Sequence, residues 1–243
     1  RRIRDFVWHD LADDYVELVK GRLYGGRPGE RDAARHALHT ALSASLRMLA
    51  PFAPFATEEL YAHLPGTDSS VHAASWPAVE VDDPEAERAG RLVADVASEV
   101  RAWKSDRGLA LNAELDHVEV YVDDGLERPP DTYDLSETIN APVHVREGSP
   151  DVELTPADVE VDHSIVGPEF REQAGAVVAA LEAADPAELK AQAVSTGGVE
   201  LEVDGESVEV DGEAFTVTEE YRAEGGEEVE VLETDDATVV VYP

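Results

Sequence analysis

The sequence predicts a bundle of α-helices over residues 1–113, followed by a small acidic α+β domain over residues 114–243. Apolar residues recur every three or four positions in the first part, as on one face of a helix. They alternate with polar residues in much of the second part, as in half-buried strands. The charge changes at the same place: the first part holds 14 Arg or Lys against 18 Asp or Glu, and the second holds 5 against 36.

Four amphipathic segments in the first part predict four helices joined by short connections, for which a bundle is the usual packing. The turn residues 24–29 end the first helix, Pro51 and Pro54 stop the second, and a loop over residues 65–84 precedes the fourth. The third helix is short and starts near Thr57. The apolar positions of the other three are Ile3, Val7, Leu11, Tyr15 and Leu18; Leu38, Leu42, Leu46 and Leu49; and Ala89, Leu92, Val93, Val96, Val100 and Trp103.

The second part predicts a mixture of strands and helices. The segment His117–Val122 alternates as a strand should, and helices are expected over residues 131–140 and 168–184. A second strand is expected over residues 142–146, and from Val199 onward the chain should be strands alone. Two Asp-Gly pairs, at residues 204–205 and 211–212, are typical of hairpin turns.

Composition excludes several classes of protein. The chain has 243 residues and no Cys, which excludes disulfides and thiolate zinc sites. It has no apolar run near the roughly 20 residues that a membrane helix needs. The net charge is −35, and only Lys20, Lys104 and Lys190 are lysines. That balance is typical of proteins from salt-accumulating halophiles, and the alternative is an acidic interaction module at ordinary salt. Because the chain starts at Arg1 without Met, we expect a fragment of a longer polypeptide.

Four phrases in fixed order carry a family resemblance. They are WHDLADDYVELVKGRLY at residues 8–24, LRMLAPFAPFATEELY at 46–61, SVHAASWP at 70–77 and RAWKSDRGL at 101–109. Together they resemble the anticodon-binding domain of class I aminoacyl-tRNA synthetases, and within that class the valyl-tRNA synthetases. Asp14 and Tyr61 stand where the family usually has Trp. The resemblance is dense over residues 6–125, and the family domain normally begins one helix before Arg1.

The resemblance implies the C-terminal part of a cytoplasmic, monomeric valine–tRNA ligase. Such a part would position tRNA(Val) for aminoacylation by upstream catalytic and editing domains, which would use ATP and Mg²⁺. No cofactor is expected in the chain itself, since the family's HIGH and KMSKS signatures and a phosphate-binding P-loop are missing from its sequence. The same region of an isoleucine–tRNA ligase is one alternative, and an acidic protein-interaction module is the other.

Basic residues of the first part are the candidate contacts to RNA, because arginine binds phosphate in a bidentate manner and stacks on bases. No catalytic residue is expected, and no metal site, since His36 and His39 lack an obvious third ligand. Trp8, Tyr15 and Phe52 are expected in the core with Trp103. Residues 199–243 are expected to contribute least to RNA binding. The predicted nucleic-acid-binding residues are Arg4, Lys20, Arg22, Arg88, Arg91, Arg101, Lys104 and Arg107.

Overall fold

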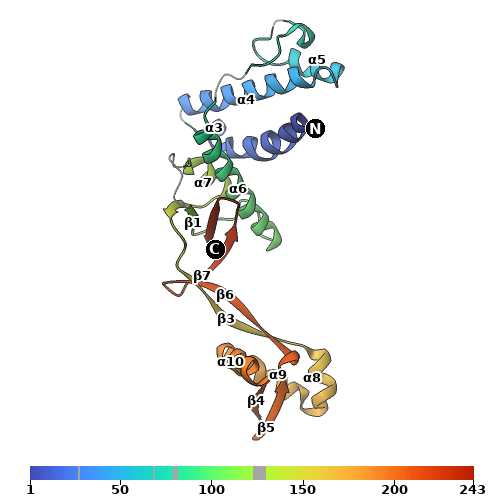
Figure 1. The fold of residues 1–243 in the computed structure, drawn as a ribbon, viewed down its shortest axis with the longest axis vertical. Helices are drawn as coiled ribbons and strands as arrows, with labels where there is room; N and C mark the ends of the chain where they lie inside the picture. Colours follow the sequence, from blue (N-terminus) through green and yellow to red (C-terminus); the bar gives the residue numbers. More distant parts are fainter. Residues whose placement is uncertain (27, 68, 79–81, 123–129) are drawn as a thin grey trace. The chain divides into compact units, whose positions relative to one another are not determined.

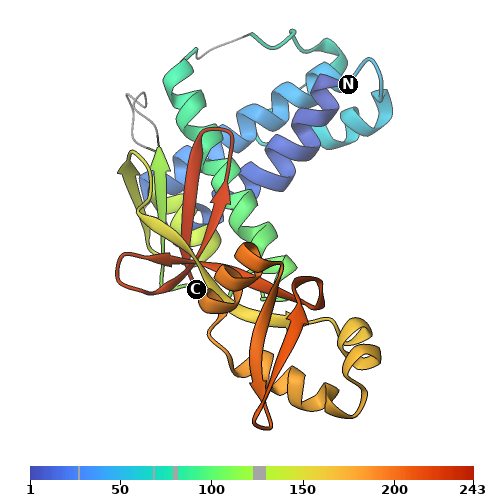
Figure 2. The same ribbon diagram turned by 60° about the horizontal axis from the view of Figure 1, so that its bottom comes forward.

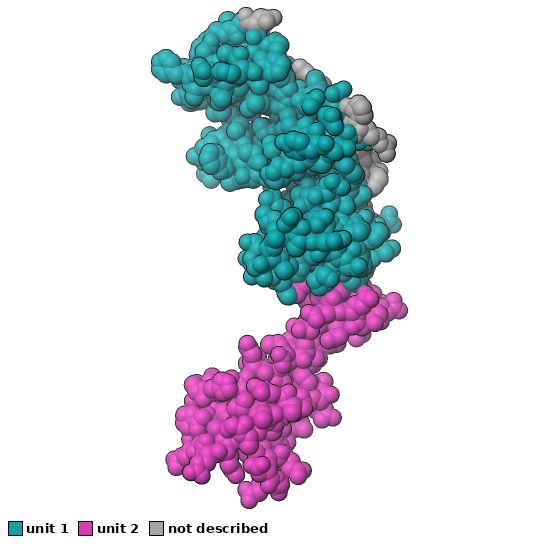
Figure 3. Space-filling model, turned by 180° about the vertical axis from the view of Figure 1, so that it is seen from behind, with its two compact units in different colours: residues 1–150, 231–243 teal, residues 151–230 magenta. Residues whose placement is uncertain are grey.

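A computed structural model describes residues 1–26, 28–67, 69–78, 82–122 and 130–243 (Figure 1). Arg27, in the turn predicted after the first helix, lies outside the described residues, as do residues 68 and 79–81 of the predicted loop. The chain forms two compact units, coloured separately in Figure 3. Unit 1 comprises residues 1–150 and 231–243, and unit 2 comprises residues 151–230. Every helix in the described ranges is too short or too polar to span a membrane.

The N-terminal half of unit 1 is helical, as the apolar periodicity predicts. A helical run from Arg2 to Tyr24 passes from an α-helical to a π-helical segment and back to an α-helical one. It is interrupted at Val19, where ψ is 0°. Helix α4 (Pro28–Leu49) ends two residues before Pro51, whereas Pro54, which was expected to stop this helix, is the first residue of α5. Asp83 caps the start of α6 (Pro84–Asp106) by accepting a hydrogen bond from the backbone N–H of Ala86. The helices are α1 (Arg2–Asp5), the π-helix η1 (Phe6–Tyr15), α2 (Val16–Leu18), α3 (Lys20–Tyr24), α4 (Pro28–Leu49), α5 (Pro54–Ala62), the 3₁₀-helix η2 (Val71–Ala73) and α6 (Pro84–Asp106).

Unit 1 also contains a sheet built from both ends of its sequence. Strand β1 (His117–Val122) pairs in parallel with β2 (Val143–Glu147) and antiparallel with the C-terminal strand β8 (Ala237–Tyr242). Helix α7 (Thr132–Ile139) connects β1 to β2 and ends at Asn140, which has a positive φ of 51°. Figure 2 shows the red C-terminal strands beside the green strand β1.

The core of unit 1 lies between α6, α7 and this sheet. Its members come from all three: Leu92, Val96, Val100 and Trp103 from α6, Leu135 and Ile139 from α7, and Val118, Val120, Val239 and Val241 from the strands. The apolar stripe of α6 is therefore buried mainly by strands and α7. Among the described residues before α6, Leu18 is the one that belongs to this core.

The predicted fold class, a helical bundle followed by a separate α+β domain, is wrong. The described part of the chain is α+β, with strands hydrogen-bonded in the order β2-β1-β8-β7-β6-β3 and a second sheet of β4 and β5. The physical reason is that an apolar stripe shows which face of a helix is buried but not what covers it. The domain division at residue 113 concerns independent folding and stays a prediction.

Unit 2 packs three helices against a long antiparallel pair and a hairpin. Strand β3 (Val152–Val161) pairs with β6 (Phe215–Ala223), with an irregularity between Pro156 and Asp158. The core contains Val166, Val177, Leu181, Leu189, Val199 and Val210. The other elements are α8 (His163–Phe170), η3 (Arg171–Gln173), α9 (Ala174–Ala183), α10 (Pro186–Thr196), β4 (Gly198–Val203), β5 (Glu206–Asp211) and η4 (Gly212–Ala214). The division between the two units falls within β7 (Glu228–Glu233).

One of the two predicted hairpin turns is confirmed. Asp204 and Gly205 connect the paired strands β4 and β5, and both have positive φ, 52° and 84°. The prediction at Asp211 and Gly212 is wrong, because these residues lead into η4 and the following strand β6 pairs with β3.

Candidate nucleic-acid interface

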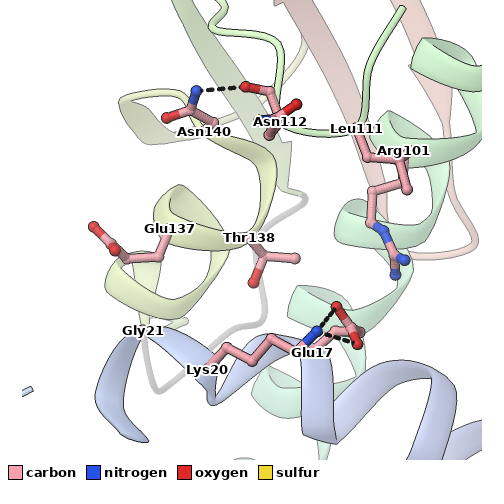
Figure 4. Close-up of a pocket in the computed structure, with 9 residues that line it drawn as sticks. All are labelled: Glu17, Lys20, Gly21, Arg101, Leu111, Asn112, Glu137, Thr138 and Asn140. Carbon is pink, nitrogen blue, oxygen red and sulfur yellow. Dashed lines mark hydrogen bonds and ion pairs between the residues drawn. The ribbon is translucent and has the colours of Figure 1, made fainter. Parts of the chain in front are cut away.

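Two of the eight predicted cations, Lys20 and Arg101, line one pocket in unit 1 (Figure 4). The pocket has a volume of about 470 Å³ and lies among the α2–α3 segment, α6, the loop after α6 and the end of α7. On one side, Lys20 Nζ lies 2.6 Å from Glu17 Oε1. On the other side, Asn140 Nδ2 donates to the backbone oxygen of Asn112 at 2.9 Å. The lining residues are Glu17, Lys20, Gly21, Arg101, Leu111, Asn112, Glu137, Thr138 and Asn140.

Arg22 follows Lys20 closely in sequence but is directed into the protein. Its guanidinium forms an ion pair with Asp134 of α7, whose side chain is almost completely buried. Burial raises the pKa of Asp134 even though Arg22 opposes that shift. Within the described residues, Arg22 Nε and Asp134 Oδ1 have no hydrogen-bond partner. Arg22 therefore links α3 to α7, and we leave it out of the surface that contacts RNA.

Lys104 is also buried, with an exposed fraction of 0%. Its ammonium donates to the backbone oxygens of Ile139 at 2.5 Å, Ala113 at 2.6 Å and Leu111 at 3.4 Å. Burial lowers the pKa of this lysine, because a charged amine is costly to remove from water. The expectation that Lys104 is an exposed cation is wrong, and it too is left out of the surface.

The other four predicted cations are exposed: Arg4, Arg88 and Arg91 lie on helices, and Arg107 directly follows the end of α6. Arg4 pairs with Asp5 at 2.8 Å, and Arg91 pairs with Glu87 at 2.6 Å. Arg88 is exposed on α6, and the Arg107 guanidinium lies 5.5 Å from the centre of the Trp103 ring. Exposed ion pairs contribute only about 0–1 kcal/mol, so a phosphate can replace the carboxylate at little cost.

The aromatic residues divide differently from the prediction. Trp103 is buried as expected, and Tyr15 is half-buried, but Trp8 and Phe52 are 67% and 80% exposed. The prediction for these two is wrong. Trp8 lies one position beyond Val7 and so off the apolar stripe of its helix, and Phe52 lies in the turn after Pro51. The positions of the apolar stripe in the first helix therefore already indicated that the Trp8 side chain is exposed.

No group of three or more potential metal ligands occurs in the part of the chain that the structure describes. His39, one of the two histidines considered from the sequence, has its Nε2 2.9 Å from the backbone oxygen of Pro65. Its role in the described structure is thus a contact between α4 and the loop after α5.

Comparison with known proteins assigns this arrangement to a family. Residues 1–121 match the family model described as the anticodon-binding domain of tRNA ligase. The chain belongs to this family. It is 61% identical over its whole length to a valine–tRNA ligase of Natronomonas pharaonis, covering 27% of that protein. The valine–tRNA ligases of Methanosarcina barkeri and Archaeoglobus fulgidus are 44% and 38% identical over 99% of the chain, again with 27% of each covered.

The chain therefore corresponds to the anticodon-binding region of valine–tRNA ligases and spans about a quarter of the length of these curated relatives. The resemblance in the four sequence phrases is confirmed. The matched segment contains all eight predicted cations, and it ends within β1.

Proposed function

We propose that this chain binds tRNA(Val) and positions it for ATP-dependent aminoacylation by other domains of the same polypeptide. The observation that carries the proposal is the family match over residues 1–121, the part of the sequence richest in basic residues. ATP and Mg²⁺ would act in those other domains, since the chain lacks the family's nucleotide-binding signatures. We also propose that the polypeptide acts in the cytoplasm as a monomer.

The proposed contact surface consists of exposed or half-exposed cations of unit 1. Unit 2 is a poor surface for a polyanion, because residues 151–230 hold 3 basic residues against 23 acidic ones. Phosphate contacts by arginine or lysine fix the position of the RNA and make its affinity depend on salt. The proposed set is Arg4, Lys20, Arg88, Arg91, Arg101 and Arg107.

Equilibrium binding to labelled tRNA(Val), measured at the lowest salt that keeps the chain folded, tests the proposal. Replacing the six cations by Gln should weaken binding and reduce the slope of log affinity against log salt, by about 0.7–0.9 for each phosphate that the variant no longer neutralises. Tighter binding of tRNA(Ile) would favour the isoleucine alternative. Binding that is absent for every tRNA, in a folded chain, would leave the acidic interaction module as the better interpretation.

A second measurement separates binding from catalysis. The isolated chain should give no valine-dependent exchange between ATP and pyrophosphate, because activation needs the nucleotide site of another domain. Exchange by the purified chain would contradict the proposed division of roles.

A further inference from the structure

We propose that the pocket lined by Lys20 and Arg101 holds one unstacked nucleotide of the bound RNA, and that Arg22 and Lys104 position its walls without touching the RNA. This inference rests on the proposed function. It adds the place where a base enters the protein and separates contact residues from positioning residues.

The chemistry of the lining suits a nucleotide. It combines two cations, two carboxylates, two amide side chains and a hydroxyl with the apolar side chain of Leu111. The charges of Lys20 and Arg101 balance those of Glu17 and Glu137, which makes the lining neutral in a chain with a net charge of −35. Donors and acceptors mixed in this way match the edge of a base better than a lone phosphate, and single-stranded RNA is recognised by such contacts to splayed bases.

The first wall of the pocket is fixed by close packing of α3 against α7. A Cβ added at Gly21 would lie 2.9 Å from Cγ of Glu137, so only glycine permits this approach. The adjacent Arg22 forms its partly buried ion pair with Asp134 on the same helix α7. Both contacts hold the segment that presents Lys20 at a fixed position beside Glu137 and Thr138.

The second wall is fixed by Lys104. Its ammonium joins the loop residues Leu111 and Ala113 to Ile139, the last residue of α7. Leu111, its neighbour Asn112 and Asn140 all line the pocket, and Asn140 directly follows Ile139. The positive charge also lies at the C-terminus of α7, where the helix dipole favours a cation. One buried side chain thus positions both sides of this wall.

The spacing of the cations explains how two of the four sequence phrases, residues 8–24 and 101–109, each supply both kinds of residue. Lys20 and Arg22 are two positions apart on a helix and so point in different directions, one into the pocket and one into the protein. Arg101 and Lys104 are three positions apart on α6. The Arg101 side chain lines the pocket, whereas the Lys104 side chain is buried because its ammonium contacts the end of α7. The first and the fourth phrase thus each contribute one cation that lines the pocket and one that is directed into the protein.

Site-specific crosslinking tests the pocket, and the absence of native Cys makes single-cysteine variants unambiguous. Asn112→Cys labelled with a benzophenone should crosslink to tRNA(Val) at an unpaired nucleotide. The matched control is Ser98→Cys, which is exposed on the same helix as Arg101 beside Glu99 and Asp235, and it should not crosslink. Equal crosslinking at both positions, or none at Asn112→Cys while affinity is kept, overturns the pocket alone. A parent chain that binds no tRNA overturns the proposed function as well.

Affinity measurements then separate contact from positioning. Arg101→Gln should weaken tRNA binding about tenfold or more, as expected for a hydrogen bond to a charged group. Arg222→Gln, which removes the same charge from unit 2, should change affinity less than about twofold, since an exposed arginine in an acidic region has little RNA to neutralise.

Asp134→Asn is the decisive variant for Arg22, because it removes a negative charge while leaving the arginine in place. If Arg22 positions the wall, Asp134→Asn should weaken binding several-fold although the protein has become less negative. Lys104→Met should do the same, with circular dichroism showing that both variants remain folded at the assay temperature. Affinity that is unchanged or increased in folded Asp134→Asn and Lys104→Met would overturn the positioning roles.

Discussion

Lys104 brings a positive charge into the core of unit 1 and partners three backbone oxygens there. A buried polar group without a partner costs about 1–3 kcal/mol. Removing the ammonium leaves these backbone oxygens without that donor and should therefore destabilise the folded state strongly. We expect Lys104→Met to lower the free energy of unfolding by about 3 kcal/mol in urea titrations at fixed KCl. Lys190→Met, which removes a partly exposed pair with Glu219, should cost no more than about 1 kcal/mol. Similar costs for the two variants would show that burial of Lys104 is unimportant.

The lowered pKa of Lys104 gives this residue a signature in the dependence of stability on pH. The folded chain releases this proton at a lower pH than the unfolded chain, whose value is near 10.5. Between the two values unfolding takes up a proton, so the contribution of Lys104 to stability rises with pH in that window. The difference in unfolding free energy between the parent and Lys104→Met should therefore grow as pH rises from neutral toward 10.5. A constant difference would contradict the lowered pKa.

At the scale of elements, the approach of α3 to α7 at Gly21 is the most sensitive contact. A methyl group there meets both Cβ and Cγ of Glu137, which are close to the backbone and cannot swing away. Gly21→Ala should destabilise unit 1 by about 1–3 kcal/mol, the usual cost of overpacking. Gly29→Ala in α4 meets no atom within 4 Å and should be neutral or stabilising by up to about 1 kcal/mol. Thermal unfolding of the two variants decides between overpacking and a general effect of helical Ala.

Strand β8 shows why elements were easier to predict than their packing. The segment ATVVVY was predicted as a strand from its sequence, and its residues Val239, Val240 and Val241 are fully buried. That they pair with β1, about 120 positions earlier, has no local signal, because strand pairing depends on which apolar faces meet. For the same reason, Arg22 and Lys104 looked like surface cations: their partners Asp134 and Ile139 are remote in sequence.

The position of β8 in unit 1 determines which deletion can test whether the acidic region contributes to RNA binding. Deleting residues 199–243 would take β8 out of the core of unit 1, so loss of RNA binding would then report unfolding. Replacing residues 151–230 by a Gly-Ser linker removes unit 2 and keeps β8. We expect tRNA affinity to stay within about threefold of the parent, or to rise, because 23 carboxylates that repel phosphate have been removed. A large decrease in affinity in a folded variant would place RNA contacts in unit 2.

At the scale of the whole molecule, a net charge of −35 destabilises the folded state through self-repulsion. In unit 1, η1, α6 and the turn before β8 bring Asp14 near Asp95 and Asp95 near Asp235, so that their negative charges repel one another. Burial and neighbouring carboxylates raise the pKa of Asp14 and of Asp95. A raised folded-state pKa means that the protonated form is favoured by folding, so stability from these two groups falls as pH rises through that value.

Salt should relieve this repulsion, because the Debye length falls from about 10 Å at 0.1 M to about 3 Å at 1 M. We expect the melting temperature, followed by circular dichroism, to rise as KCl goes from millimolar to molar. Asp95→Asn should raise the melting temperature at low KCl, since it removes one of the clustered charges, and the gain should shrink toward zero at molar KCl. Glu200→Gln on the exposed face of β4 is the matched control and should show a smaller gain. A melting temperature independent of KCl, or a gain from Asp95→Asn that is equal at both salts, would mean that packing rather than charge sets the stability of this acidic chain.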